Sequence, residues 1–151
     1  MKMMLGIDER KGIVAHDTQE IVVFRVEDML CGLEIECIQE INKNMEVTPV
    51  HMAPDYVMGV INLRGEIVTI VDVRSKFGVS QASMNKKKNK NIIVQSEGEM
   101  VGLFVDEVDD IVEADMTRMQ PPPSHLSGRM GQYFTGVYEL ENELVAIMDV
   151  E

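Results

Sequence analysis

The feature that most constrains the fold is an internal repeat. Segment 59–73 aligns without a gap on segment 136–150, and both begin with Gly-Val and end with the pattern V-x-I-x-D-V. Two earlier blocks align in the same order, 27–41 on 97–111 and 22–24 on 92–94. Blocks that keep their order at a nearly constant offset indicate a duplicated structural unit of about 55 residues. The chain therefore contains two copies of one unit.

Both copies consist mainly of strand signals. Short runs rich in Val and Ile are separated by turn residues, as in VMGVINL, EIVTIVDV and MVGLFV, and such runs are typical of β-strands. Helical periodicity is not sustained over ten residues anywhere. Short helical turns are expected only at 35–41, 73–77 and 105–111. The sequence therefore predicts a mainly β protein.

The size of the copies predicts how they are arranged. A unit this small buries only about 60% of its surface when it folds alone, so the two copies are expected to pack on each other. Short strands with tight turns suit small closed barrels, which leave no exposed sheet edge. We expect two small barrels that share a hydrophobic seam. The expected division is a tail at 1–19, a first unit at 20–78, a polar linker at 79–91 and a second unit at 92–151. This division allows strands to be exchanged between the units.

Composition narrows the class of partner. The net charge is −12, from 26 acidic and 14 basic residues, which argues against nucleic acid and anionic membrane surfaces as main partners. The basic run at 86–90 is interpreted as a solvated loop. No window approaches the ~18 apolar residues of a membrane span, and Cys31 and Cys37 lack disulfide or zinc spacing. A cytoplasmic protein with reduced, structural cysteines is the simplest interpretation.

Motifs of catalysis are absent from the sequence. It contains no nucleophile elbow, no H-E-x-x-H and no glycine-rich phosphate loop. The acidic run at 106–115 lacks the pattern of a calcium loop and is interpreted as a solvated face. We therefore expect no enzymatic activity, no cofactor and no metal.

One residue of the repeat is not explained by folding. The tip of the predicted hairpin in the first copy reads L-R-G-E, where Gly65 can supply a positive φ. The equivalent tip in the second copy carries Glu141 and Asn142, so the two tips have opposite charge. Because the duplicate folds without an arginine, Arg64 is either a partner contact or an ordinary exposed residue.

The same segments resemble a known family. GVINLRG followed by IVTIVDVRSKFG, with FRVEDMLCGLEIECIQEI before it and MVGLFVDEVDDIV after it, is similar to the signature of the CheW family of bacterial chemotaxis coupling proteins. The resemblance runs from about residue 20 to the end of the chain. It implies two intertwined five-stranded barrels that act as a non-enzymatic cytoplasmic adaptor. Such an adaptor links the CheA histidine kinase to the cytoplasmic tips of chemoreceptors, and its partners recruit it to receptor arrays at the membrane.

The resemblance also implies two contact regions. The residues implied in receptor binding are Arg64, Asn62, Ile67, Ile92, Val108 and Ile111. The residues implied in binding the regulatory domain of the kinase are Ile38, Glu40 and Gly59. The apolar members of the first set are expected to line a groove between the barrels, in which one face of a receptor helix could lie.

Two other functions stay open at this point. The chain could be a CheW-like regulatory domain of a larger chemotaxis protein, either the kinase itself or a fusion with a receiver. It could also be a small nucleic-acid-binding barrel, which the negative charge and the lack of interleaved aromatic residues oppose.

Overall fold

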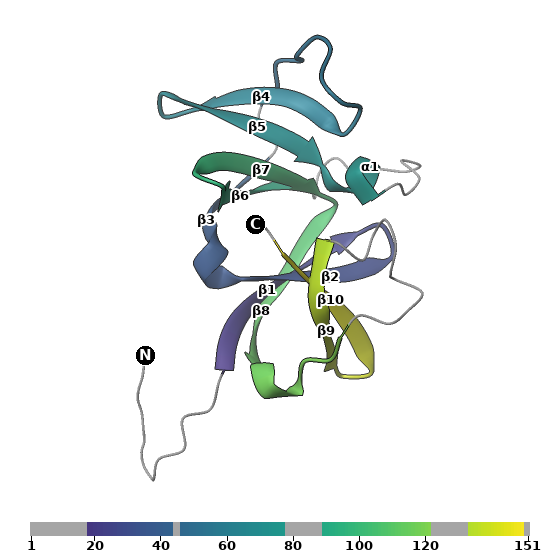
Figure 1. The fold of residues 1–151 in the computed structure, drawn as a ribbon. Helices are drawn as coiled ribbons and strands as arrows, with labels where there is room; N and C mark the ends of the chain where they lie inside the picture. Colours follow the sequence, from purple (N-terminus) through teal and green to yellow (C-terminus); the bar gives the residue numbers. More distant parts are fainter. Residues whose placement is uncertain (1–17, 44–45, 78–88, 122–132, 150–151) are drawn as a thin grey trace.

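The computed structural model describes residues 18–43, 46–77, 89–121 and 133–149, and within these ranges the fold is almost entirely β (Figure 1). The strands are β1 (Thr18–Val26), β2 (Met29–Glu34), β3 (Ile38–Lys43), β4 (Val57–Leu63), β5 (Glu66–Asp72), β6 (Lys90–Ser96), β7 (Glu99–Val105), β8 (Glu107–Asp115), β9 (Phe134–Leu140) and β10 (Glu143–Met148). The short helical elements are η1 (Ile35–Cys37), α1 (Val73–Phe77) and η2 (Met116–Arg118). The prediction of a mainly β protein is confirmed.

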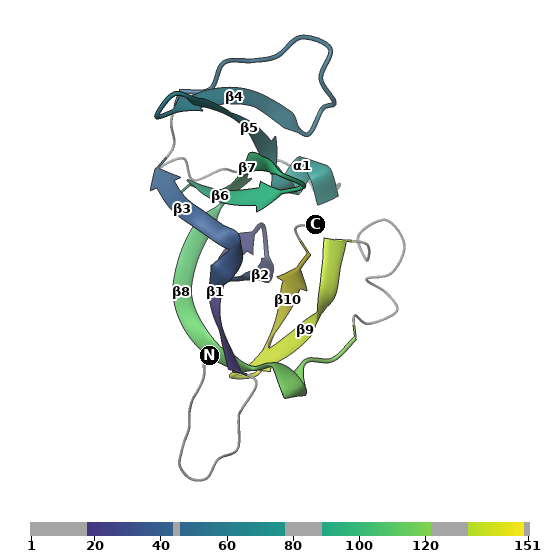
Figure 2. The same cartoon turned by 60° about the vertical axis from the view of Figure 1, so that its left-hand side comes forward.

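The strands form two five-stranded sheets, one above the other in Figures 1 and 2. The lower sheet has the order β8-β1-β2-β10-β9, and the upper sheet has the order β3-β6-β7-β5-β4. Each sheet therefore takes one hairpin from one copy of the repeat and three strands from the other copy. The hairpin β1–β2 lies in the lower sheet with the strands of the second copy, and β6–β7 lies in the upper sheet with those of the first.

The connections between strands explain this exchange. If each copy formed its own sheet, β3 would pair with β1 and would run parallel to β2. In the second copy, β8 would pair with β6 and would run parallel to β7. Parallel strands of one sheet need a crossover of about a dozen residues or more. Only η1 separates β2 from β3, and only Asp106 separates β7 from β8. The chain therefore continues directly from one sheet into the other.

The closed barrels expected from the sequence are curled, open sheets instead. Within the described residues the edge strands of each sheet form no ladder with each other. A single bridge joins Thr48, which follows β3, to Val60 on β4, and an equivalent bridge joins Gln120 to Val137 on β9. Each bridge has two backbone hydrogen bonds of 2.8–2.9 Å. In each sheet, the segment that follows one edge strand (β3 or β8) is therefore hydrogen-bonded to the opposite edge strand (β4 or β9).

The predicted hydrophobic seam between the two units is confirmed. One apolar cluster takes residues from both sheets, and two further clusters each belong to one sheet. The seam includes Phe24, Val26, Cys31, Leu33, Ile92, Val94, Leu103 and Val105. Full burial of such side chains contributes about 1.5–3 kcal/mol each, so the seam is a major link between the sheets. Burial there raises the pKa of the Cys31 thiol to about 12.

Three local expectations had different outcomes. The helical turn predicted at 73–77 is confirmed as α1, and the turn at 35–41 is reduced to η1 at 35–37. The helical turn predicted at 105–111 was wrong, because Val105 ends β7 and residues 107–111 belong to β8, which pairs antiparallel with β1. Most of the expected tail and most of the expected linker lie outside the described residues, and Thr18 and Gln19, assigned to that tail, belong to β1. Lys90 and Asn91, assigned to that linker, belong to β6.

Candidate functional site

The tip of the hairpin β4–β5 is built by a two-residue turn. Arg64 has φ +51° and Gly65 has φ +89°, values that suit the right-handed twist of a hairpin. The backbone N–H of Gly65 donates a hydrogen bond of 2.9 Å to Oδ1 of Asn62. The prediction of a positive φ at Gly65 is confirmed, and Asn62 has a structural task in holding the turn.

Arg64 pairs with Glu40 of β3. One guanidinium nitrogen donates to Oε1 of Glu40 and the other lies 3.4 Å from Oε2, so the contact involves both carboxylate oxygens. The Arg64 side chain is 72% exposed and that of Glu40 is 25% exposed. Hydrogen bonding by Arg64 holds the pKa of Glu40 below its ordinary value, and Glu40 raises the pKa of Arg64. The two residues, implied in contacts with different partners, therefore form one charged pair.

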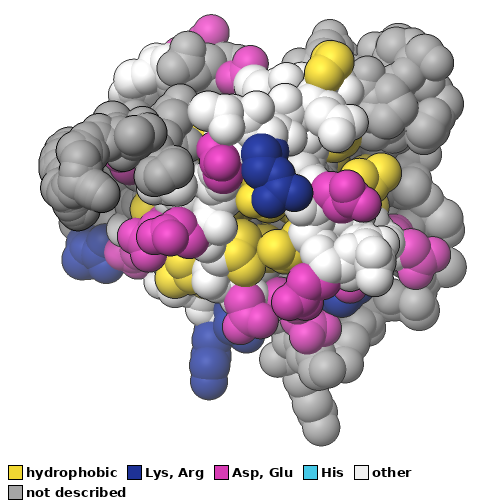
Figure 3. Space-filling model, turned by 90° about the horizontal axis from the view of Figure 1, so that it is seen from below, with side chains coloured by type: hydrophobic (Ala, Val, Ile, Leu, Met, Phe, Trp, Pro, Cys, Tyr) yellow, Lys and Arg dark blue, Asp and Glu magenta, His cyan; other side chains and the backbone are white. Residues whose placement is uncertain are grey.

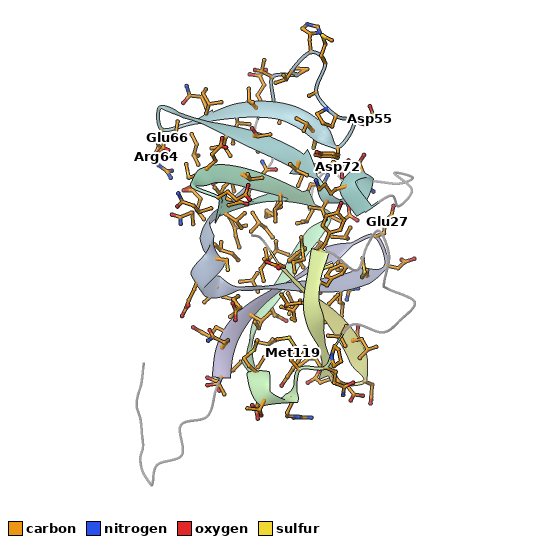
Figure 4. All side chains as sticks on the ribbon, in the orientation of Figure 1. Glu27, Asp55, Arg64, Glu66, Asp72 and Met119 are labelled. Atoms are coloured by element: carbon orange, nitrogen blue, oxygen red, sulfur yellow. The ribbon has the colours of Figure 1, made fainter. Side chains whose placement is uncertain are left out.

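Apolar side chains lie exposed on the same sheet. Ile67, directly opposite Asn62 on β5, is 64% exposed, and Ile41 on β3 is 40% exposed. Figure 4 shows Arg64 and Glu66 together at the free end of the hairpin, away from the body of the molecule. An exposed apolar residue beside an accessible guanidinium is suited to a protein contact, since Arg is enriched in interfaces.

The other residues implied in receptor binding have different surroundings. Ile111 on β8 of the lower sheet is 56% exposed. Val108 on the same strand is half-buried and packs against the seam. Ile92 is fully buried in the seam, so its side chain cannot touch a partner on this surface. The contact implied at Ile92 stays a prediction without an exposed side chain to support it, because the alternation of β6 turns this side chain toward the lower sheet.

The residues implied in kinase binding are also of two kinds. Glu40 is accessible, whereas Ile38 is half-buried against the seam. Gly59 is buried with φ +146°, and a Cβ at this position would lie 2.2 Å from the carbonyl oxygen of Thr48. Gly136 has the equivalent position in the second copy, where a Cβ would lie 2.6 Å from the carbonyl oxygen of Gln120. The Thr48–Val60 and Gln120–Val137 bridges therefore each require a glycine at the first position of the repeated Gly-Val pair.

A cavity between the sheets does not involve the predicted groove residues. Its walls are mostly apolar, and its lining residues are Val71, Val73, Lys76, Val94, Ser96, Val101, Leu103, Tyr133, Met148 and Asp149. The ammonium of Lys76 lies 3.8 Å from the ring centre of Tyr56 and 5.7 Å from that of Tyr133. None of the six residues implied in receptor binding lines this cavity.

Sequence analysis missed a buried arginine. Arg74 in α1 is 1% exposed, and its guanidinium lies 3.3 Å from Glu27 and 3.5 Å from Asp106. Its backbone N–H donates to Oδ1 of Asp72 at 3.1 Å. Glu27 belongs to the β1–β2 turn, and Asp106 is the residue through which the chain passes between the sheets. No local pattern indicates this cluster, because its carboxylates come from three distant segments.

The Arg74 cluster is remote from the Arg64–Glu40 pair. Figure 4 places Glu27 and Asp72 at the opposite end of the upper sheet from Arg64. The two groups of charges therefore differ in exposure. The Arg64–Glu40 pair is exposed at a hairpin tip, and the Arg74 cluster is buried where the sheets meet. Of these two, the Arg64–Glu40 pair is the one accessible to a partner.

The described residues show no sign of two other kinds of site. Across 18–43, 46–77, 89–121 and 133–149, no three His, Cys, Asp or Glu side chains are grouped so that they could bind a metal ion. No helix in these ranges has the length and apolar character needed to cross a membrane. Seen from below, the described side chains show acidic groups scattered around isolated basic ones (Figure 3). The acidic run at 106–115 contains all of β8 and the preceding Asp106.

Comparison with known proteins identifies relatives over nearly the whole chain. A family model described as a CheW-like domain matches residues 20–151. The chemotaxis protein CheW of Klebsiella aerogenes is 33% identical over 134 residues, which cover 88% of this chain and 80% of the relative. The chemotaxis protein CheW of Rhizobium meliloti is 32% identical over 133 residues, which cover 88% of this chain and 85% of the relative.

A solved structure has the same fold. The crystal structure of the scaffolding protein TtCheW from Thermoanaerobacter tengcongensis superposes with a TM-score of 0.83 at 27% identity. The superposition covers 93% of this chain and 92% of that structure. The arrangement of two sheets with exchanged hairpins is therefore shared across almost the full length of both chains.

Proposed function

The chain belongs to the CheW family, and from this premise we propose that it is a non-enzymatic adaptor that couples the CheA histidine kinase to the cytoplasmic tips of chemoreceptors. On this proposal it is cytoplasmic and reaches the membrane only through its partners. The observation that supports the proposal most directly is the exposed hairpin tip, where Arg64 and Ile67 are accessible together.

The receptor is proposed to bind across the two sheets. Arg64, Asn62 and Ile67 form the part on the upper sheet, and Ile111 with the half-buried Val108 forms the part on β8. A receptor helix that presents apolar residues at helical spacing could place them against the isoleucines. Its acidic or polar groups could then pair with the guanidinium of Arg64.

The kinase is proposed to bind at Glu40 on β3. Glu40 supplies the accessible charge, and Ile38 lies on the same strand. Gly59 contributes backbone rather than a side chain, and its first task is the bridge to Thr48. The two proposed surfaces meet where Arg64 contacts Glu40.

An adaptor of this kind changes kinase activity through binding free energy. A receptor conformation that binds the adaptor–kinase assembly more tightly shifts the kinase equilibrium by that difference in affinity and by no more. Individually modest contacts are sufficient when many of them act together in an array.

The test is a pair of binding measurements with a kinase regulatory domain and a receptor-tip fragment. We expect Ile67→Asp to lose receptor binding and to retain kinase binding, because β6 and β7 lie between β5, which carries Ile67, and β3, which carries Glu40. Glu40→Lys should lose kinase binding. Leu144→Asp is a matched control, since Leu144 is 58% exposed on the lower sheet, close to the 64% of Ile67. It should bind both partners.

Other outcomes distinguish the alternatives. Normal receptor binding by Ile67→Asp would contradict the receptor surface. Binding of the receptor fragment without any affinity for the separate kinase would favour a regulatory domain of a larger protein. Binding of neither protein, with retention of single-stranded DNA on a filter at low salt, would favour the nucleic-acid-binding alternative.

A further inference from the structure

A pair of amides interrupts the interior of the upper sheet. Asn91 on β6 is fully buried, and neither atom of its amide group has a hydrogen-bond partner. It lies directly opposite Asn42 on β3 and opposite Phe104 on β7. Asn42 is half-buried, and its side chain interacts with the carboxylate of Glu40. Because Phe104 belongs to the apolar cluster of the upper sheet, the two amides face the same interior. Buried polar side chains usually have a partner, so Asn91 is exceptional.

The second copy of the repeat supplies a direct comparison. Alignment of the copies places Asn91 on Ile21 and Asn42 on Val112, and the structure pairs Ile21 with Val112 in the lower sheet. Ile21 is 1% exposed, and Val112 packs against the same apolar cluster. The same position of the same ladder therefore holds two aliphatic side chains in one sheet and two amides in the other, and the fully buried one of these amides, Asn91, has no hydrogen-bond partner.

The next residue pair of each ladder does not differ between the sheets in the same way, because both sheets place like charges there. In the upper sheet this pair is Lys43 with Lys90, and in the lower sheet it is Glu20 with Glu113. Like charges directly opposite each other weaken both ladders in the same way. The amide pair and the length of the strand therefore distinguish β3 from β8 at this end of the ladder, because the β1–β8 ladder continues to Thr18 and Asp115 and the β3–β6 ladder ends at Lys43 and Lys90.

We propose that the Asn42–Asn91 pair makes β3 the point of local opening of the upper sheet. β3 is an edge strand whose ladder pairs only with β6, so its separation breaks no other ladder of the sheet, although it releases the contact between Glu40 and Arg64. In the folded state the amide of Asn91 lacks hydrogen bonds, whereas opening exposes it to water, which supplies those bonds. The amide pair therefore lowers the free energy of opening of β3 relative to an aliphatic pair.

The test replaces the amides by the residues of the other copy. Hydrogen exchange of backbone amides is measured in the full chain for β3 and for the equivalent residues of β8. In the wild type we expect β3 to exchange at least about tenfold faster, which corresponds to about 1.4 kcal/mol in opening free energy. In Asn42→Val/Asn91→Ile the exchange of β3 should slow by about tenfold while that of β8 is unchanged.

Control variants distinguish the effect of the amides on hydrogen exchange from the effects of the length and edge position of β3. Asn42→Val/Asn91→Val adds less volume and should also slow exchange if isoleucine is too large for the site. Gln39→Thr raises strand propensity at an exposed position of β3, and it should leave the difference in exchange rate between β3 and β8 unchanged. Equal exchange of β3 and β8 in the wild type, or no slowing in either double variant, would overturn the proposal.

Discussion

Arg64 at the tip of the β4–β5 hairpin contacts both carboxylate oxygens of Glu40 on β3. The contact links two edges of the upper sheet, because β3 and β4 are its first and last strands. It also joins the two proposed binding surfaces. A partner that binds Arg64 through a carboxylate must therefore compete with Glu40.

The first prediction concerns the titration of Glu40. Its pKa is lowered from 4.5 in the folded protein, first by the hydrogen bond from Arg64. A lowered folded pKa means that the ion pair stabilises the fold above the unfolded pKa, and that this contribution is lost as the pH falls through the folded pKa. In Arg64→Ala the midpoint should rise toward 4.5, measured by NMR of the side-chain carboxyl carbon. An unchanged midpoint would show that the pair does not form in solution.

The second prediction separates two glycines of the same hairpin. Gly59→Ala should lower the free energy of unfolding by about 3 kcal/mol or more, because the new Cβ meets a backbone oxygen that cannot move without breaking the Thr48–Val60 bridge. Gly65→Ala should lower it by only about 1–2 kcal/mol, the strain of a positive φ, since no atom lies within 4 Å of its Cβ position. Urea denaturation measures both, and equal losses would contradict the role of the bridge.

The third prediction concerns the buried arginine. Arg74→Met should lower the free energy of unfolding by about 3–5 kcal/mol, because it leaves buried carboxylates without their cation. Arg25→Met is the control, since the Arg25 side chain is 40% exposed in its pair with Asp109, and such pairs contribute about 0–1 kcal/mol. Chemical denaturation of both variants provides the comparison. A loss at Arg74 no larger than at Arg25 would show that the cluster does not hold the sheets together.

The fourth prediction concerns the thiols. Cys31 is fully buried and has a pKa of about 12, so in the native protein it should resist alkylation at pH 8, because thiolate is the reactive form. Cys37 is half-buried and should react first. Mass spectrometry after timed iodoacetamide treatment identifies the labelled residue, with urea-unfolded protein as the control in which both react. Rapid labelling of Cys31 in folded protein would show that the seam opens readily.

The repeat and the local turn chemistry predicted much of the fold. The alignment of 59–73 on 136–150 predicted two equivalent β units, and the sheets contain equivalent strands. Gly65 was predicted at a positive φ from its place between two strand signals, and it has one. The segment at 105–111 was mispredicted as helical, because Val and Ile recur there at a spacing that also fits a long twisted strand paired with β1.

The candidate site was only partly predictable. The exposed tip at Arg64 could be located from the unequal tips of the two copies. The burial of Ile92 could not, since β6 is buried on both faces from Asn91 to Val94, and the second sheet that covers one of these faces comes from distant parts of the chain. The ion pair of Arg64 with Glu40 and the cluster around Arg74 join residues far apart in the chain, and no local pattern specifies such pairs.

The sequence by itself determined the strands, the tight turns and the duplication, because these depend on side chains within a few residues of one another. The tertiary structure decided which hairpin lies in which sheet, which aliphatic face is buried and which charges meet. The connections at η1 and Asp106 are too short for a crossover within one sheet, so the hairpins exchange. That exchange brings Asn42 to Asn91 in one sheet and Ile21 to Val112 in the other, and it makes two similar halves unequal.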